Sequence, residues 1–371
     1  MKDIGEGTIR RIDWTELTPV VLLLRVFNVA LGLRILALAL IGFWLTLQLG
    51  FLLGIPLQGH LVGPNAVHIH PERLIGLPSP SDGPYPDVAT NMPVAVWQVF
   101  YGVLYPYFQD SIFRLSILLE RPALLFWLPG FVLIWALCGG MICRIVAVRL
   151  TVDESESIGN LLLFFRKRGI GFVSSLIILS LGILCCFLPI KLAYWLAAVP
   201  GLKYVVAVLL PIPLLFAFFT VLLTLGLAAG WMLLFAAVSV DGSDGVDAIS
   251  RMFSYIFQRP LHCLFYWFCS GILGWLGLGL VEIISQLVIH LCYGIISEGI
   301  AGYWSLLFSS LPSAYALAWF WTSSVAIYLL LRRSVDATPF NEVYRAAPPK
   351  VRVLPTIKPD KHGAPEIKES E

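Results

Sequence analysis

The stretch VVAVLLPIPLLFAFFTVLLTLGLAAGWMLLFAAV, residues Val205–Val238, contains no charged side chain. An apolar run of about 18 or more residues is long enough to cross the hydrocarbon core of a bilayer as a helix. This run is longer than one crossing needs, so we expect Pro211 and Pro213 to mark a kinked or interfacial entry. The stretch therefore predicts a membrane-spanning helix.

The rest of the chain has the same apolar character. Of its 371 residues, 58% are hydrophobic and only 13% are charged, which is too few charges to cover a soluble domain of this size. The sequence therefore predicts an all-α integral membrane protein, folded as a six-span helical bundle. The expected spans are Ile35–Ile55, Pro122–Cys143, Ile170–Ile190, Val205–Val238, Cys263–Val281 and Trp304–Leu331.

Positive charge in the short loops predicts the orientation of these spans. Most Lys and Arg residues fall in alternate loops, and six spans would place those loops and both termini in the cytoplasm. We therefore expect a multi-pass protein of the inner or plasma membrane. The predicted cytoplasmic side carries Arg10, Arg11, Arg25, Arg144, Arg149, Arg166, Lys167, Arg168, Arg251, Arg259, Arg332 and Arg333, and the other side carries Arg73, Arg114, Arg121, Lys191 and Lys203.

A five-residue motif, [ST]-V-D-x-[ST], occurs three times beside predicted spans on the cytoplasmic side. Asp and Ser are residues that cap the unpaired first amides of a helix, so the motif predicts a junction where one helix ends and another begins. Asp153 and Glu156 have the spacing of a capping box. A ligand or partner site is the alternative interpretation. The junction and capping residues, with a looser N-terminal copy, are Asp13, Asp153, Ser155, Asp241, Ser243, Asp336 and Thr338.

Apolar residues recur at helical spacing after each copy, which predicts short amphipathic interfacial helices at the membrane surface or under the bundle. Motif, surface helix, outward span, external helix and returning span would then form a unit. We expect a three-fold hairpin repeat of such units. The apolar stripes are Ile158, Leu161, Leu162 and Phe165; Val246, Ile249, Phe253 and Ile256; and Phe340, Val343 and Tyr344.

The expected domain organisation follows from these units. A membrane domain covers residues 1–345, with units at about 12–150, 152–238 and 240–333 and an external loop over residues 56–93. Residues 346–371 combine several prolines with mixed charges, so we expect a disordered cytoplasmic tail.

Glu282, Gln286 and His290 are spaced four residues apart, with Ser285 beside them, and so are expected to share one helical face. One interpretation makes this polar stripe the wet face of an external interfacial helix. The other makes it an intramembrane polar site, because ionisable groups at membrane depth often serve transport.

Other polar features give weaker indications. His68, His70 and Glu72 could offer metal ligands from an extended strand, but they lie in a proline-rich loop and no further His or Cys pairs with them. We therefore expect no metal and no cofactor. Glycines such as Gly226 and Gly230 are expected to permit close helix packing. Lys and Arg are scattered at a formal net charge of +2, which predicts no nucleic-acid partner.

Trp14-x-Glu16-Leu17, Arg25-x-Phe27-x-x-Ala30 and the passage Asp241–Pro260 resemble uncharacterised bacterial polytopic membrane proteins. Residues Val240–Tyr255 are also loosely similar to the surface-helix element of the membrane-anchor domain of bacterial glycerophosphodiesterases. The first resemblance covers most of the chain and the second only this passage. Both imply an integral membrane module, and neither carries a catalytic motif.

The chain contains no Walker A loop, H-E-x-x-H, G-x-S-x-G, C-x-x-C or glycine-rich dinucleotide motif. We therefore expect a non-enzymatic membrane scaffold or accessory protein that engages membrane lipids, a protein partner or a second copy of itself. A small-solute or ion transporter or channel that uses the polar stripe is the first alternative. An intramembrane lipid-modifying enzyme, with His262 or Glu282 in acid–base roles, is the second.

Overall fold

The fold was obtained as a computed structural model, which describes residues 21–53, 123–293, 298–345, 356–359 and 365–368. Apart from one short strand pair, the regular structure in these ranges is helical. The elements are α2 (Val21–Ala30), α3 (Leu33–Leu52), α7 (Ala123–Thr151), α8 (Ile158–Arg168), α9 (Ile170–Ala197), α10 (Leu202–Leu209), α11 (Pro211–Asp241), α12 (Gly245–Gln258), α13 (Pro260–Tyr293), α14 (Glu298–Asp336), β1 (Thr356–Pro359) and β2 (Pro365–Lys368).

Within the described ranges, six helical segments are long and apolar enough to cross a membrane, and six is the number that the sequence predicted. A helix is the natural state of such runs, because it satisfies every backbone hydrogen bond within the segment. The prediction of a helical, multi-pass membrane protein is thereby confirmed. The segments are Leu33–Gly50, Pro129–Thr151, Ile158–Ala197, Pro211–Asp241, Pro260–Leu291 and Leu307–Asp336.

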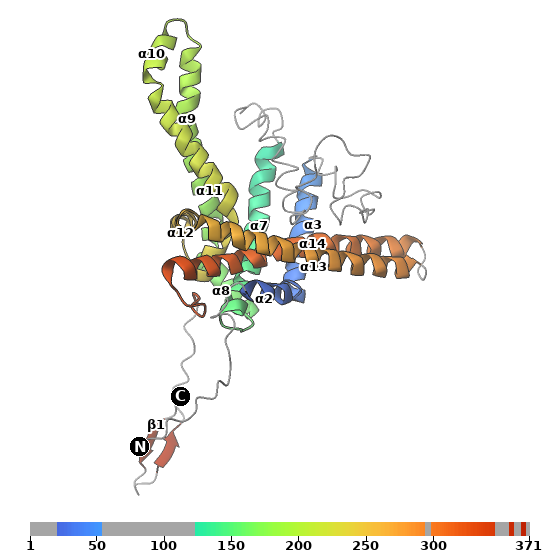
Figure 1. Cartoon of the computed structure of the whole chain (residues 1–371). Helices are drawn as coiled ribbons and strands as arrows, with labels where there is room; N and C mark the ends of the chain where they lie inside the picture. Colours follow the sequence, from blue (N-terminus) through green and yellow to red (C-terminus); the bar gives the residue numbers. More distant parts are fainter. Residues whose placement is uncertain (1–20, 54–122, 294–297, 346–355, 360–364, 369–371) are drawn as a thin grey trace.

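The long helices form three neighbouring pairs: α3 with α7, α9 with α11, and α13 with α14. Figure 1 shows that the pairs diverge from a shared region instead of running parallel, with the α13–α14 pair extending across the direction of α3 and α7. We call this shared region the base; it contains α2, α8, α12 and the C-terminal ends of α7, α11 and α14. The α9–α11 pair projects from the base and carries α10 at its tip.

An aromatic cluster joins α7, α11 and α14. The ring centroid of Trp321 in α14 lies 4.7 Å from that of Phe235 and 5.5 Å from that of Trp231, both in α11, and 5.8 Å from that of Trp135 in α7. A Cβ at Gly139 of α7 would lie 2.7 Å from the Trp321 ring, so the glycine makes room for it. Offset and edge-on ring contacts of this kind stabilise a core beyond the area they bury.

Within the C-terminal tail, for which the sequence predicts disorder, Thr356–Pro359 and Pro365–Lys368 form an antiparallel pair, β1 with β2. Ile357 is opposite Ile367, and Lys358 is opposite Glu366. Apolar and oppositely charged cross-strand pairs of this kind stabilise a hairpin.

Candidate functional site

The three copies of the repeated motif lie where α7, α11 and α14 end. Each copy contains one residue in the left-handed conformation: Asp153 (φ 60), Gly242 (φ 64) and Ala337 (φ 54). A left-handed residue just beyond a helix turns the chain away from the helix axis and ends the helix. The motif is therefore a helix stop in all three places.

The following helices are capped by residues outside the motif. The side chain of Ser157 accepts a hydrogen bond from the Asn160 amide at the start of α8. Asp244 accepts one from the Asp247 amide, at 2.9 Å, at the start of α12. The first-amide capping expected of Ser155 and Ser243 thus falls to Ser157 and Asp244, because the chain needs extended residues between a left-handed turn and a new helix.

The third junction does not lead into a surface helix. The prediction of a helix around Phe340, Val343 and Tyr344 is therefore wrong. Residues 337–345, which we call the C-terminal segment, are not helical and turn back over the second junction. The Tyr344 amide donates to the carbonyl oxygen of Val240 at 2.8 Å. A Cβ at Gly242 would lie 2.6 Å from the Tyr344 ring, so this contact requires a glycine.

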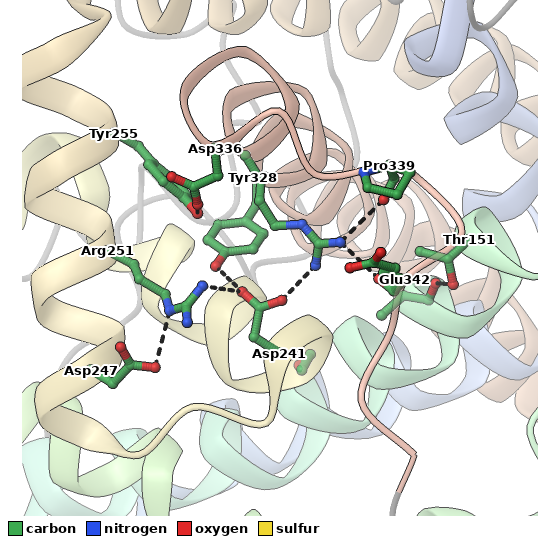
Figure 2. Close-up of polar contacts among 12 residues, drawn as sticks. Thr151, Asp241, Asp247, Arg251, Tyr255, Tyr328, Asp336, Pro339 and Glu342 are labelled. Carbon is green, nitrogen blue, oxygen red and sulfur yellow. Dashed lines mark hydrogen bonds and ion pairs between the residues drawn. The ribbon is translucent and has the colours of Figure 1, made fainter.

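Figure 2 shows a cluster of charged and phenolic side chains around Asp241, the last residue of α11. The Asp241 carboxylate pairs with Arg332 of α14 and, at 3.1 Å, with Arg251 of α12. It also accepts a hydrogen bond from the Tyr328 hydroxyl. Arg251 continues the chain of ion pairs to Asp247 at 3.0 Å. We call these five residues, with Tyr255 and Asp336, the ionic cluster.

The ionic cluster runs from the interior to the surface. The side chains of Arg332, Asp241, Arg251 and Asp247 are 4%, 14%, 36% and 47% exposed, in that order. Burial strengthens an ion pair only where the remaining donors and acceptors are also satisfied. Arg332 meets that condition, because it also donates to the carbonyl oxygens of Pro339 at 3.2 Å and Glu342 at 2.9 Å.

The position of the two aspartates at helix ends explains why they need such partners. Asp241 and Asp336 are the last residues of α11 and α14, where the helix dipole already places negative charge. Asp241 is compensated by two guanidinium groups. Asp336 accepts a hydrogen bond from the Tyr255 hydroxyl of α12.

Tyr255 and Arg251 lie on α12, outside the membrane-length segments. Burial raises the pKa of Tyr255, and its hydrogen bond to Asp336 raises it further. Burial lowers the pKa of Arg251, but the opposing effects of Tyr328, Asp241 and Asp247 leave it raised. Both groups therefore keep their protons near neutral pH, which suits a fixed link between helices.

A second buried ion pair joins the first junction to the base. Arg144 of α7 has a side chain that is 2% exposed and pairs with Glu156 at 3.3 Å. It also donates to the carbonyl oxygen of Ser239 at 2.9 Å and lies 4.5 Å above the Phe164 ring of α8. Glu156 is therefore the partner of an arginine and not part of a capping box.

Outer ion pairs complete the links among the junctions. Asp153 pairs with Arg25 of α2 at 3.2 Å, and Glu154 pairs with Arg345 of the C-terminal segment at 3.7 Å. The C-terminal segment thus contacts the first and second junctions together.

The structure divides the polar stripe of α13. Glu282 and Ser285 are buried, Gln286 is half-buried and His290 is exposed, so the four do not form one polar face. His262 is also exposed and lies 20 residues before Glu282 on the same helix, about 30 Å away at 1.5 Å per residue. These two residues cannot serve one substrate as an acid–base pair.

The glycines of α11 and α13 permit close packing. The atoms that pack against them belong to side chains of neighbouring helices and not to a neighbouring backbone. A Cβ at Gly226 would lie 2.1 Å from Phe253 of α12. One at Gly230 would lie 2.4 Å from Ile256. On α13, a Cβ at Gly274 would lie 2.4 Å from the Trp319 indole nitrogen of α14.

Several predicted residues lie outside the described part of the chain: Asp13, the external loop 56–93, and within that loop His68, His70 and Glu72. In the part that is described, no three His, Cys, Asp or Glu side chains are grouped so that they could hold a metal ion. Comparisons of the chain with family models, curated proteins and solved structures found no match.

Proposed function

We propose that this chain is a non-enzymatic scaffold or accessory protein of the inner or plasma membrane, with both termini in the cytoplasm. The observation that carries the proposal is the ionic cluster. Asp241 receives three donors from α12 and α14, so its charge is used to join helix ends. This arrangement favours a rigid base that presents surface helices to lipids, a protein partner or a second copy.

The orientation is supported by the positions of the basic residues. Arg25, Arg166 and Arg251 lie on α2, α8 and α12, the short helices of the base. Lys191 and Lys203 lie near the tip of the α9–α11 pair, at the opposite end. An excess of basic residues on one side favours the cytoplasm for that side.

The order of the elements supports a three-fold hairpin repeat. A short helix precedes each pair of long helices, namely α2 before α3 and α7, α8 before α9 and α11, and α12 before α13 and α14. A copy of the motif follows each returning helix. We propose that the chain arose from three such units, in keeping with its resemblance to uncharacterised bacterial polytopic membrane proteins.

A transporter or channel is the second candidate, because Glu282 and Ser285 are buried on a helix of membrane length. Ionisable side chains in such positions are costly and often serve transport. The exposed His290 does not join them.

A flux measurement separates the two candidates. The full chain is reconstituted into vesicles that contain a pH-sensitive dye, beside a Glu282→Ala/His290→Ala variant. We expect both to hold an imposed proton gradient as well as empty vesicles do. A wild-type leak that the double substitution abolishes would establish the transporter and overturn the scaffold.

A scaffold function also requires that one defined protein partner, or a second copy of the chain, binds at the base. A photo-crosslinking residue is placed at Val246 of α12, which is 63% exposed, and a matched one at Gly182 of α9, where an added Cβ would have nothing within 4 Å. We expect one defined membrane protein, or a second copy of the chain, to crosslink at Val246 and not at Gly182. The same random products at both positions would contradict a scaffold.

A further inference from the structure

The surface helix α8 passes almost directly into α9. Gly169 alone separates them, and its own backbone is helical (φ −57, ψ −32). Together they form an apolar helical stretch of 40 residues, Ile158–Ala197. At 1.5 Å per residue this is about 60 Å long, twice the hydrocarbon thickness of a bilayer. The 28 residues of α9 suffice for the crossing, so α8 belongs at the level of the headgroups.

The two sides of α8 differ. Leu161 and Phe164 are buried, and the Phe164 ring contacts the Tyr344 ring and the Arg144 guanidinium group. The opposite side carries Ile158 and Leu162, which are 72% and 64% exposed, followed by the exposed Arg166. These three are spaced four residues apart and so form one stripe. We call this stripe the α8 outer face.

We propose that the α8 outer face binds the anionic phospholipid surface of the cytoplasmic leaflet. Ile158 and Leu162 enter the boundary between headgroups and acyl chains, and Arg166 contacts lipid phosphates. The inference rests on the proposed scaffold function and names the partner of one of its surface helices.

Two observations favour lipid over a protein partner. The α8 outer face continues into the exposed apolar side chains at the start of α9, beginning with Ile170, which is 83% exposed. A side chain there must meet acyl chains if α9 crosses the membrane. In addition, α8 carries three basic residues and no acidic one, so its surface suits an anionic partner.

The acidic residues near α8 already have partners inside the chain. Glu156 pairs with Arg144, and Glu154 pairs with Arg345. Arg168, the remaining basic residue of the last turn, lies 5.2 Å from the Tyr344 ring centroid. Arg166 is thus directed outward without an acidic neighbour on its own helix, which leaves its charge for phosphate.

The first test locates the α8 outer face relative to the bilayer. A fluorescent amino acid is placed at Leu162, and at Asn160 as a matched exposed position on another side of α8, in the full chain reconstituted in vesicles. We expect brominated phospholipid to quench the probe at Leu162 and iodide to quench the probe at Asn160. Quenching of Leu162 by iodide alone, or by neither, would overturn the proposal in favour of water or a covering protein segment.

The second test measures the preference for anionic lipid. Vesicles contain phosphatidylcholine with spin-labelled phosphatidylglycerol, and the immobilised lipid is compared for wild type, Arg166→Gln and Lys203→Gln. Removing the Arg166 charge should weaken the preference about fivefold, as expected for about 1 kcal/mol per cation near an anionic surface. The Lys203→Gln variant should match wild type. Equal loss in both variants, or no loss in either, would overturn the proposal.

These results are independent of the scaffold assignment. A proton flux through the wild-type chain, with the lipid preference intact, would remove the scaffold and leave the lipid site standing. Loss of the lipid preference with no flux would do the reverse. Unchanged thermal unfolding of Arg166→Gln in detergent confirms that this variant is folded.

Discussion

The left-handed residues that end α11 and α14 differ in side chain, and this difference sets an expectation for stability. Ala337 adopts φ 54, where a Cβ costs roughly 1 kcal/mol, so Ala337→Gly should stabilise the protein by about that amount. Gly242→Ala should destabilise it by more, because the new Cβ would also lie 2.6 Å from the Tyr344 ring. Thermal unfolding of both variants in the same detergent tests whether their unfolding temperatures shift in opposite directions. Two shifts of the same sign would show that backbone strain does not control these junctions.

Asp241 and Asp247 both pair with Arg251, but they differ in burial. Asp241→Asn weakens the pair with the nearly buried Arg332 and should cost about 3–5 kcal/mol. Asp247→Asn removes a half-exposed pair and should cost less than about 1 kcal/mol. Unfolding followed by intrinsic tryptophan fluorescence measures both. Equal losses would show that the cluster is not organised around Asp241.

The sequence identified the junction aspartates but not their partners. Asp241 and Asp336 were recognisable because the motif recurs beside apolar runs. Their donors lie far along the chain, 91 residues away for Arg332 and 81 for Tyr255, and depend on how the helix pairs meet. Arg144 differs from these donors, because a cation inside an apolar segment is unusual. Its importance was therefore recognisable from the sequence.

At the scale of elements, the contact between α11 and α12 depends on small residues. Replacing Gly230 by Leu would place side-chain atoms where Ile256 and Met252 now lie, within 2.4–2.6 Å of a Cβ. Overpacking of this kind typically costs about 1–3 kcal/mol, so Gly230→Leu should lower the unfolding temperature. Gly182→Leu on α9 is the control, because nothing lies within 4 Å of a Cβ there. A drop of the same size in the control would contradict a specific α11–α12 contact.

The existence of α8 and α12 was predictable from apolar spacing, but their rotation was not. The expected stripe of α12 began with Val246, which is 63% exposed, whereas Ala248, Met252 and Tyr255 are buried. On α8, Leu162 is exposed and Phe164 is buried. Beside a membrane an apolar side chain is stable against protein or against lipid, so periodicity alone does not tell which side faces the core.

At the scale of the whole molecule, the number of long helices followed from hydropathy, but their arrangement did not. Apolar length decides whether a segment can cross a bilayer, and all six segments meet that condition. The divergence of the three pairs depends on contacts such as Trp321 with α7 and α11. These contacts join positions far apart in sequence, which no local pattern reports.

The last prediction tests the proposal that the base and the tip lie on opposite sides of the membrane. Ala198, near the tip, and Asn160, on α8, are both exposed and suit substitution by cysteine. An impermeant maleimide should label Ala198→Cys on intact cells and should label Asn160→Cys only after permeabilisation, with the unsubstituted chain as the background. The reverse pattern would place the base outside. It would also remove the cytoplasmic leaflet as the partner of the α8 outer face, because the basic residues of α8 would then meet the opposite surface.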